Sequence, residues 1–172
     1  DTVFRARFPY AEMEFNEGKF PGRITLEAFN PFIPSDDKDS SIPGAFFKIK
    51  IHNTTGREIK YTVAFACCNP FVDGTINTSF RGDGVTGIRM TSAGRDDDSV
   101  IISTDAEHTA CQDYWYRGSW FDDSTVYWQE FKAAGDIPQR RYAEPGKSDM
   151  CTLCASVSIP PFGDGEIRFL LS

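Results

Sequence analysis

The sequence predicts an all-β fold, an antiparallel β-sandwich with one short helix near residues 124–134. Apolar and polar residues alternate along much of the chain, as in ITLEAF at 24–29 and FKIKI at 47–51. This period of two is typical of antiparallel strands that bury one face. Clusters of Gly, Pro and Asp separate the alternating runs, as in PPFGDG at 160–165. Many short strands at this spacing favour a sandwich.

The expected elements follow in order along the chain. VFRARF near the start has a strand-like composition, and alternation then predicts strands at 11–15, 24–29, 46–51, 61–65, 86–90, 99–104, 153–159 and 167–171. HNTTGREIK, at 52–60, predicts a hairpin connection with Gly56 in the left-handed conformation. Two acidic runs, Asp36–Asp39 and Asp96–Asp98, lack the ligand spacing of an EF-hand calcium loop and predict solvated turns.

One segment departs from the alternation and predicts the helix. In STVYWQEFKAAG, Ser124 is a suitable N-cap, aromatic residues recur at helical spacing, and Gly135 is a suitable stop. The segment is long enough for about three turns.

Length and charge restrict the class of protein. The 172 residues, 40% of them hydrophobic, are enough for one globular domain with a sizeable core. With a net charge of −7 and Lys and Arg scattered along the chain, a nucleic-acid partner is not expected. No apolar run approaches the roughly 20 residues of a transmembrane helix. Strand-like sequence at both ends predicts that residues 1–172 are an excised part of a longer protein.

The chain has cysteines without a regular disulfide framework: Cys67, Cys68, Cys111, Cys151 and Cys154. An odd count of this kind predicts free buried thiols and therefore a reducing, cytoplasmic location. Cys151 and Cys154 have the spacing of a zinc knuckle, but on a strand residues three apart face opposite sides. We therefore predict neither a metal site nor a cofactor.

Two pairs of residues are candidate contact sites. Trp115 and Trp120 lie in an aromatic-rich run and predict either a platform for stacking sugars or the packing of the helix on the sandwich. Phe32 and Ile33 lie in the polar, Pro-rich loop NPFIPSDDKDSSIPG and predict either inward packing or a contact outside this chain. No catalytic apparatus is recognisable, since neither histidine is near a nucleophile signature.

Three segments carry a resemblance to a known family: RFPYAEMEF, ITLEAFNPFIP and DSSIPGAFFKIKIHNTTGREIKYTVAFA. In this order they resemble the N-terminal domain of glycoside hydrolase family 116, which includes the non-lysosomal glucosylceramidases, or bile-acid β-glucosidases. TVYWQEFKAAG and CASVSIPPFGDGEIRFLLS resemble later parts of the same domain more weakly. Cys67–Cys68 and the loop-rich stretch Gly82–Gly94 depart from the family pattern and leave the substrate open.

The resemblance implies a β-sandwich and a parent protein that is a retaining β-glycosidase acting on β-glucosides, glucosylceramide among them. The Glu nucleophile and Asp acid/base of the family lie in a C-terminal (α/α)6 helical barrel that this chain lacks, so no catalytic residue is carried over. The resemblance therefore implies a non-catalytic accessory domain that supports the active site of the helical domain, near which Phe32 and Ile33 would lie. The alternatives are a free-standing carbohydrate-binding module using Trp115 and Trp120, and a structural interaction domain without a ligand.

Overall fold

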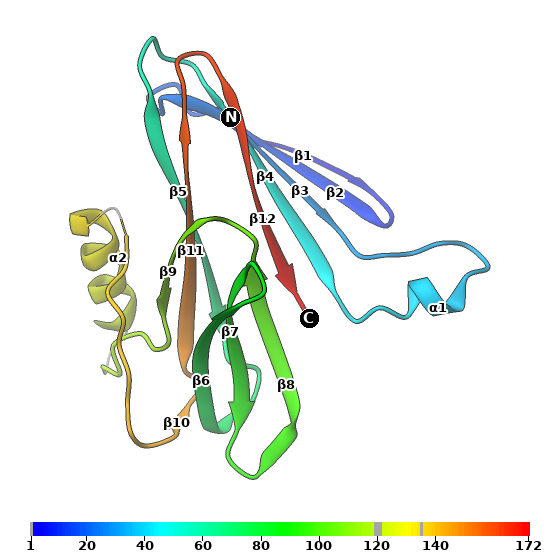
Figure 1. Cartoon of the computed structure of the whole chain (residues 1–172), viewed down its shortest axis with the longest axis vertical. Helices are drawn as coiled ribbons and strands as arrows, with labels where there is room; N and C mark the ends of the chain where they lie inside the picture. The colour runs from blue at the N-terminus through cyan, green and yellow to red at the C-terminus, as the bar shows by residue number, and fades with distance from the viewer. Residues whose placement is uncertain (1, 119–121, 135) are drawn as a thin grey trace. The chain divides into compact units, whose positions relative to one another are not determined.

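The fold is an all-β antiparallel sandwich, as the alternation predicted, and its helices are short (Figure 1). The computed structural model describes residues 2–118, 122–134 and 136–172. The chain divides into two compact units: unit 1 comprises Asp1–Tyr61 and Val157–Ser172, and unit 2 comprises Thr62–Ser156. In the described part of the chain, no helix is both long and apolar enough to cross a membrane.

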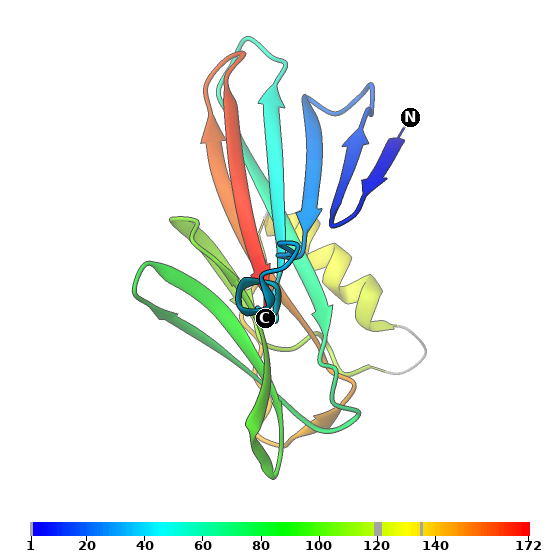
Figure 2. The ribbon, with the colours of Figure 1, turned by 90° about the vertical axis from the view of Figure 1, so that its right-hand side faces the viewer.

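Unit 1 is built on an antiparallel sheet with the strand order β1-β2-β3-β4-β12. The strands are β1 (Thr2–Arg7), β2 (Tyr10–Phe15), β3 (Gly22–Phe29), β4 (Ala45–Asn53) and β12 (Asp164–Leu171). Figure 2 shows them side by side, with β1 at the edge. Every neighbouring pair in this order keeps a continuous register, so each row across the strands places its side chains on one face.

Alternation gives this sheet two different faces. On one face, Leu26, Ile49 and Ile167 lie directly opposite one another across neighbouring strands, and Ile49 and Ile167 are buried. On the other face, the Glu27 carboxylate accepts a hydrogen bond from Lys50 Nζ at 2.5 Å. The period of two in the sequence therefore corresponds to burial on one side and paired charges on the other.

The connection from β4 to β5 (Ile59–Cys68) is organised by Asn53 rather than by a glycine. The expectation for Gly56 was wrong, because the glycines with positive φ lie elsewhere in the described chain. The buried Asn53 carboxamide accepts from the Thr55 N–H at 3.0 Å and donates to the Arg57 carbonyl at 2.7 Å. A side chain that satisfies backbone groups in this way fixes a turn without a left-handed residue.

The strands of unit 2 form two groups of hydrogen-bonded neighbours. One is β8-β7-β6-β10, formed by β6 (Asp73–Gly82), β7 (Val85–Ser92), β8 (Arg95–Thr104) and β10 (Gly146–Lys147). The other is β5-β11-β9, with β11 (Met150–Ile159) and β9 (His108–Gln112). The side chains that are fully buried in this unit include Ile88, Met90, Ile102 and Leu153.

Three strands of unit 2, β6, β9 and β10, were not predicted. In β6, Thr75 and Asn77 are buried although they are polar. The Thr75 hydroxyl donates to the Asp149 carboxylate at 2.5 Å, and the Asn77 N–H donates to the Tyr114 hydroxyl at 2.9 Å. Because partners distant in sequence satisfy these polar groups, β6 is stable without the apolar alternation that identifies a strand.

The acidic run Asp96–Asp98 was expected in a turn and instead lies within β8. The turn of this hairpin is shorter than expected: Gly94 has φ 78°, and Ser92 pairs with Arg95 directly beyond it. The described carboxylates of the run are exposed, so the strand carries them without burying charge.

The stretch Gly82–Gly94, interpreted as rich in loops, is mostly strand. It contains β7, and the preceding turn consists of Asp83 at φ 52° and Gly84 at φ 76°. Two residues with positive φ make the tight turn that matches the twist of a hairpin.

The predicted helix is present as α2 (Asp122–Ala134), which begins before Ser124. Ser124 is therefore inside the helix and is not its N-cap, while two aspartates in the first turn interact favourably with the helix dipole. The acidic run Asp36–Asp39 forms a second helix of one turn, α1 (Asp37–Ser40), in place of the expected turn. Asp36 caps it by accepting the Asp39 N–H at 3.0 Å.

Candidate functional site

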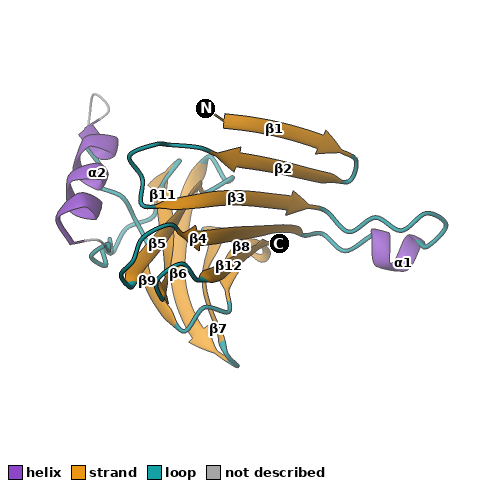
Figure 3. Ribbon diagram, turned by 90° about the horizontal axis from the view of Figure 1, so that it is seen from above, coloured by secondary structure: helices purple, strands orange, loops and turns teal. Residues whose placement is uncertain are grey.

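The loop between β3 and β4, residues 30–44, carries Phe32 and Ile33 and extends from the ends of these two strands (Figure 3). The Phe32 ring packs edge-to-face against the ring of Phe8, in the turn between β1 and β2, with centroids 5.1 Å apart. Phe32 nevertheless remains 47% exposed and Ile33 49% exposed. These side chains therefore pack partly on their own unit and leave a large part of their surface open.

Hydrogen bonds hold this loop in one shape. Asn30 Nδ2 donates to the Gly44 carbonyl at 2.8 Å, which joins the two ends of the loop. The Ser40 hydroxyl accepts from the Ile33 N–H at 2.9 Å and donates to the Ile33 carbonyl at 3.0 Å. The Asn30 N–H donates to the Pro9 carbonyl at 3.4 Å, so the loop is also joined to the β1–β2 turn. A loop fixed in this way presents its apolar side chains at a small ordering cost.

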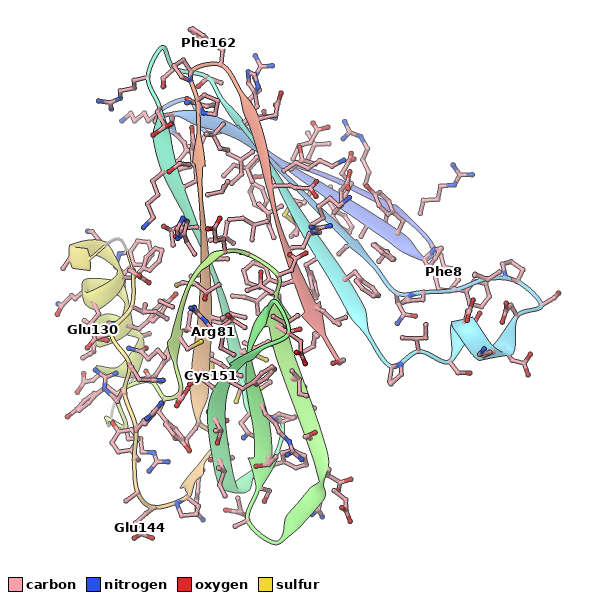
Figure 4. The ribbon with its side chains drawn as sticks, in the orientation of Figure 1. Phe8, Arg81, Glu130, Glu144, Cys151 and Phe162 are labelled. Atoms are coloured by element: carbon pink, nitrogen blue, oxygen red, sulfur yellow. The ribbon has the colours of Figure 1, made fainter. Side chains whose placement is uncertain are left out.

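Phe32 and Ile33 belong to a larger apolar surface, which we call the loop-end cluster. Its members are Phe8, Tyr10, Phe29, Phe32, Ile33 and Ile42, each at least 37% exposed. Phe8 is 81% exposed and lies at the end of the β1–β2 hairpin (Figure 4). The sequence pattern pointed to Phe32 and Ile33 but not to the other members of the cluster. The available signal was an aromatic residue before proline in a tight turn, where burial is rare.

The members of the loop-end cluster carry no charge themselves, but Tyr10 and Phe29 lie on the charged face of the sheet beside Glu27. Tyr10 and Phe29 lie opposite each other on β2 and β3, and the Phe29 ring stacks on Phe46 with centroids 4.9 Å apart. Partial burial and a hydrogen bond to the Glu27 carboxylate raise the pKa of Tyr10 to about 12. The phenol therefore stays neutral at physiological pH.

Trp115 lies in unit 2, where it holds α2 in place. Its indole Nε1 donates to the buried Thr152 hydroxyl at 2.7 Å, and its ring stacks on Tyr127 with centroids 4.1 Å apart. The stacking continues along the helix, giving a ring ladder of Trp115, Tyr127, Phe131 and Trp128. One face of Trp115 and its polar edge are thus engaged within unit 2. Trp120, the other predicted sugar-stacking residue, lies outside the described residues.

Polar contacts reinforce the attachment of α2. Glu130, labelled on the helix in Figure 4, accepts a hydrogen bond from Gln112 Nε2 at 3.0 Å and one from Arg140 Nη2 at 2.5 Å. Gln112 Nε2 also donates to the Pro138 carbonyl at 2.9 Å. The carboxylate of Glu130 therefore acts as a bridge between β9 and the chain that follows the helix.

Two buried carboxylates of unit 2, Asp113 and Asp149, are each paired with an arginine. Arg117 donates to both oxygens of Asp149 at 2.8 Å, and these hydrogen bonds raise the pKa of Arg117. Arg141 Nε donates to Asp113 Oδ2 at 3.3 Å. Both carboxylates are thus satisfied within the fold, which is typical of structural pairs.

The predicted free thiols are present, since none of the cysteines forms a disulfide. The predicted burial holds for Cys151 and Cys154, but Cys67 and Cys111 are only partly buried and Cys68 is exposed. Burial raises the pKa of Cys111 to about 11 and that of Cys154 to about 12, so these thiols are neutral packing groups. Among the residues that the structure describes, no group of three or more His, Cys, Asp and Glu side chains could hold a metal ion.

A shallow groove crosses the charged face of the sheet in unit 1. Its volume is about 690 Å³, and its lining includes Arg23, Lys50, His52, Asp164 and Glu166. His52 Nδ1 lies 2.8 Å from Asp164 Oδ1, and charges of both signs alternate across the strands. This pattern is typical of a solvated sheet face.

Among the comparisons with known proteins, the match to a protein-family model agrees with the resemblance seen in the sequence. A family model described as "beta-glucosidase 2, glycosyl-hydrolase family 116 N-term" matches residues 1–172, the whole chain. No curated protein matches the chain. Among solved structures, the chain is similar to a protein from the human microbiome described as a kojibiose phosphorylase, with 6% identity and a TM-score of 0.46. That similarity covers 95% of this chain and 17% of the other.

Proposed function

Because the chain belongs to the N-terminal family of glycosyl-hydrolase family 116, we propose that it is a non-catalytic accessory domain of a longer β-glucosidase. In this proposal residues 1–172 form a single domain of that enzyme. The Glu and Asp that cleave the glycosidic bond lie in a C-terminal (α/α)6 domain of the same polypeptide. The substrate is a β-glucoside, with glucosylceramide as the glycolipid candidate. Free thiols favour a cytoplasmic location.

The observation that carries the proposal is the difference in exposure between the two predicted contact regions. Phe32 and Ile33 stay half exposed on a loop of fixed shape. Trp115, in contrast, uses its indole N–H and one ring face inside unit 2. Exposed apolar surface on an ordered loop is typical of a protein contact. A domain of the same polypeptide is present at high effective concentration and is therefore the first partner to consider.

Docking through Phe32 and Ile33 acts on catalysis by position rather than by chemistry. Burying a large apolar side chain contributes about 1.5–3 kcal/mol, which is enough to hold a neighbouring element in one arrangement. Glycoside cleavage needs two carboxyl groups at a defined separation across the sugar. An accessory domain that steadies the loops around them therefore changes the rate without touching the substrate.

The test is the double variant Phe32→Ser/Ile33→Ser in the full-length enzyme. We expect kcat/KM for a chromogenic β-glucoside to fall about tenfold or more, because the docking energy of two side chains is lost. Phe162→Ser is the matched control: Phe162 is 65% exposed, lies on a different loop of unit 1, and should leave kcat/KM unchanged. Equal activities of the two variants would overturn the docking role of Phe32 and Ile33.

The two competing functions give different results. A carbohydrate-binding module should bind β-linked glucose oligomers with an affinity that is lost in Trp115→Ala, the change that removes the stacking ring. A structural interaction domain should show no such binding and no effect of Phe32→Ser/Ile33→Ser on kcat/KM. Calorimetry with the full-length enzyme measures the first, and the kinetic comparison measures the second.

A further inference from the structure

We propose that the docking surface of unit 1 is the whole loop-end cluster, with Phe8 at its centre, and that it takes a protein surface that is apolar in the middle and basic at its rim. This proposal rests on the proposed function, and its occupant is the helical domain of the same enzyme. It adds to that function a surface formed by two separate segments of the chain, and the chemistry of the partner.

Two segments that are separate in the sequence converge on this surface: the β1–β2 turn, and the end of β3 with the loop that follows it. Phe8 comes from the β1–β2 turn, Phe29 from the end of β3, and Phe32 from the following loop. The Phe8–Phe32 contact and the hydrogen bond from the Asn30 N–H to the Pro9 carbonyl join these two segments. The surface is therefore one fixed unit rather than a set of independent side chains.

The side chains of this surface are more exposed than those at the margin of a hydrophobic core normally are. Phe8 is 81% exposed although its ring contacts Phe32, and Ile42 on the returning part of the loop is 46% exposed. Single exposed apolar residues are common on soluble proteins, but exposed residues that contact or face one another, as Phe8 and Phe32 or Tyr10 and Phe29 do, are typical of an interaction site. Aromatic side chains at such a site contribute large contact areas at a small entropic cost.

The charges beside the cluster indicate the kind of partner. Asp36, Asp37 and Asp39 lie on or next to α1, at the outer part of the loop, with Lys38 as the one cation of that segment (Figure 3). Arg7 lies opposite Tyr10 at the hairpin end. The α1 side is therefore acidic, and a partner with Lys or Arg facing it is electrostatically complementary.

The same charges disfavour two other occupants. An anionic membrane would place lipid headgroups against the carboxylates of α1, which is repulsive within a Debye length. A second copy of this chain, paired by a two-fold axis, would bring the acidic segments of both copies into one interface. A basic-rimmed protein surface avoids both costs.

Hydrogen–deuterium exchange in the full-length enzyme tests the proposal, with peptides of the helical domain as the readout. Local loosening of the loop does not alter exchange there, whereas loss of docking does. We expect Phe8→Ser to accelerate exchange about tenfold or more in one contiguous segment rich in Lys and Arg. Asp37→Lys/Asp39→Lys should accelerate the same segment by a smaller factor that disappears at high salt.

Two control variants separate specific from general effects. Phe162→Ser removes an exposed ring from another loop of unit 1, and Asp83→Lys reverses an exposed charge in the β6–β7 turn. Neither should change exchange in the helical domain. The proposal is overturned if Phe8→Ser leaves every helical-domain peptide unchanged, or if the charge reversal slows exchange. It is also overturned if the full-length protein floats with phosphatidylserine vesicles and Phe8→Ser abolishes this.

Failure of this inference is distinguishable from failure of the proposed function. Deleting residues 1–172 from the full-length enzyme should abolish or strongly reduce β-glucosidase activity. If the deletion has this effect but Phe8→Ser leaves exchange unchanged, the accessory role stands and only the surface is wrong. If the deletion leaves activity intact, the accessory role itself is wrong.

Discussion

The loop-end cluster and the ring ladder are both rich in aromatic residues, but the two regions use them differently. In the ring ladder, Trp115 and Tyr127 lie nearly parallel with centroids 4.1 Å apart, and Thr152 satisfies the indole N–H. In the loop-end cluster, Phe8 and Phe32 touch edge-to-face and both remain open to solvent. Aromatic density in a sequence therefore does not indicate a binding site. The position of a ring relative to a covering element decides whether it packs or binds.

The largest expected effect comes from breaking the ring ladder. Trp115→Ala removes a stacked ring and leaves the buried Thr152 hydroxyl without its donor. We expect the free energy of unfolding to fall by about 3 kcal/mol, as measured by urea denaturation. Trp128→Ala is the matched control, because Trp128 is 55% exposed at the other end of the ladder, and should cost much less. Equal costs for the two variants would show that Trp115 is not a packing residue and would revive the sugar-platform interpretation.

A smaller effect should follow from removing only the polar contact of the ladder. Thr152→Val keeps the shape of a fully buried side chain but cannot accept the indole N–H. An unsatisfied buried donor costs about 1–2 kcal/mol. The measurement is a double-mutant cycle with Trp115→Phe, in which Thr152→Val should cost less once the indole N–H is gone, the remaining cost including its hydrogen bond with Tyr127. Additive costs would mean that the indole hydrogen bond does not hold the ring.

The strands predicted from alternation, such as β4, are those in which burial and polarity agree. In β4, apolar Ile49 and Ile51 are buried and Lys50 is exposed, so the alternation was visible. In β6, Thr75 and Asn77 are buried instead, and their partners Asp149 and Tyr114 are distant in sequence. A pattern read locally cannot reveal a strand whose interior is stabilised by such distant hydrogen bonds.

The candidate site was predictable only in part, for a similar reason. Phe32 and Ile33 drew attention because they are apolar residues in a polar loop. Phe8 and Phe29 did not, because both follow strand-like sequence in which an aromatic residue is normally buried. Their exposure depends on how the β1–β2 hairpin and the end of β3 leave the sheet uncovered, which is a tertiary property.

Alkaline pH should destabilise unit 2, which contains the ring ladder, more than unit 1, which contains the loop-end cluster. The reason is that every cysteine lies in unit 2 and none lies in unit 1. Burial raises the pKa of Cys154 to about 12, whereas an unfolded thiol titrates near its ordinary value. The unfolded chain therefore loses protons first, so stability is full below about pH 8.5 and falls as pH rises further. This thiol should account for about 1 kcal/mol of the loss at pH 9.5.

Urea unfolding followed by tryptophan fluorescence measures this loss in unit 2, where all the tryptophans lie. Cys154→Ala should reduce the difference in stability between pH 7.5 and pH 9.5. Cys68→Ala is the matched control, since Cys68 is exposed and should leave the difference unchanged. A pH dependence that is the same in both variants would contradict the assignment to the buried thiol.

The smallest expected effect on the free energy of unfolding concerns the loop-end cluster. Phe32→Ser/Ile33→Ser should change the free energy of unfolding by less than about 0.5 kcal/mol per residue, because both side chains are half exposed. Phe169→Ser, at a position only 2% exposed in the same unit, provides the contrast and should cost about 3 kcal/mol or more. A cost for Phe32→Ser that approaches the cost for Phe169→Ser would mean that the loop packs inward as part of the core. The loop-end cluster would then be a stabilising edge of unit 1, and the docking role would have to be carried by a different surface.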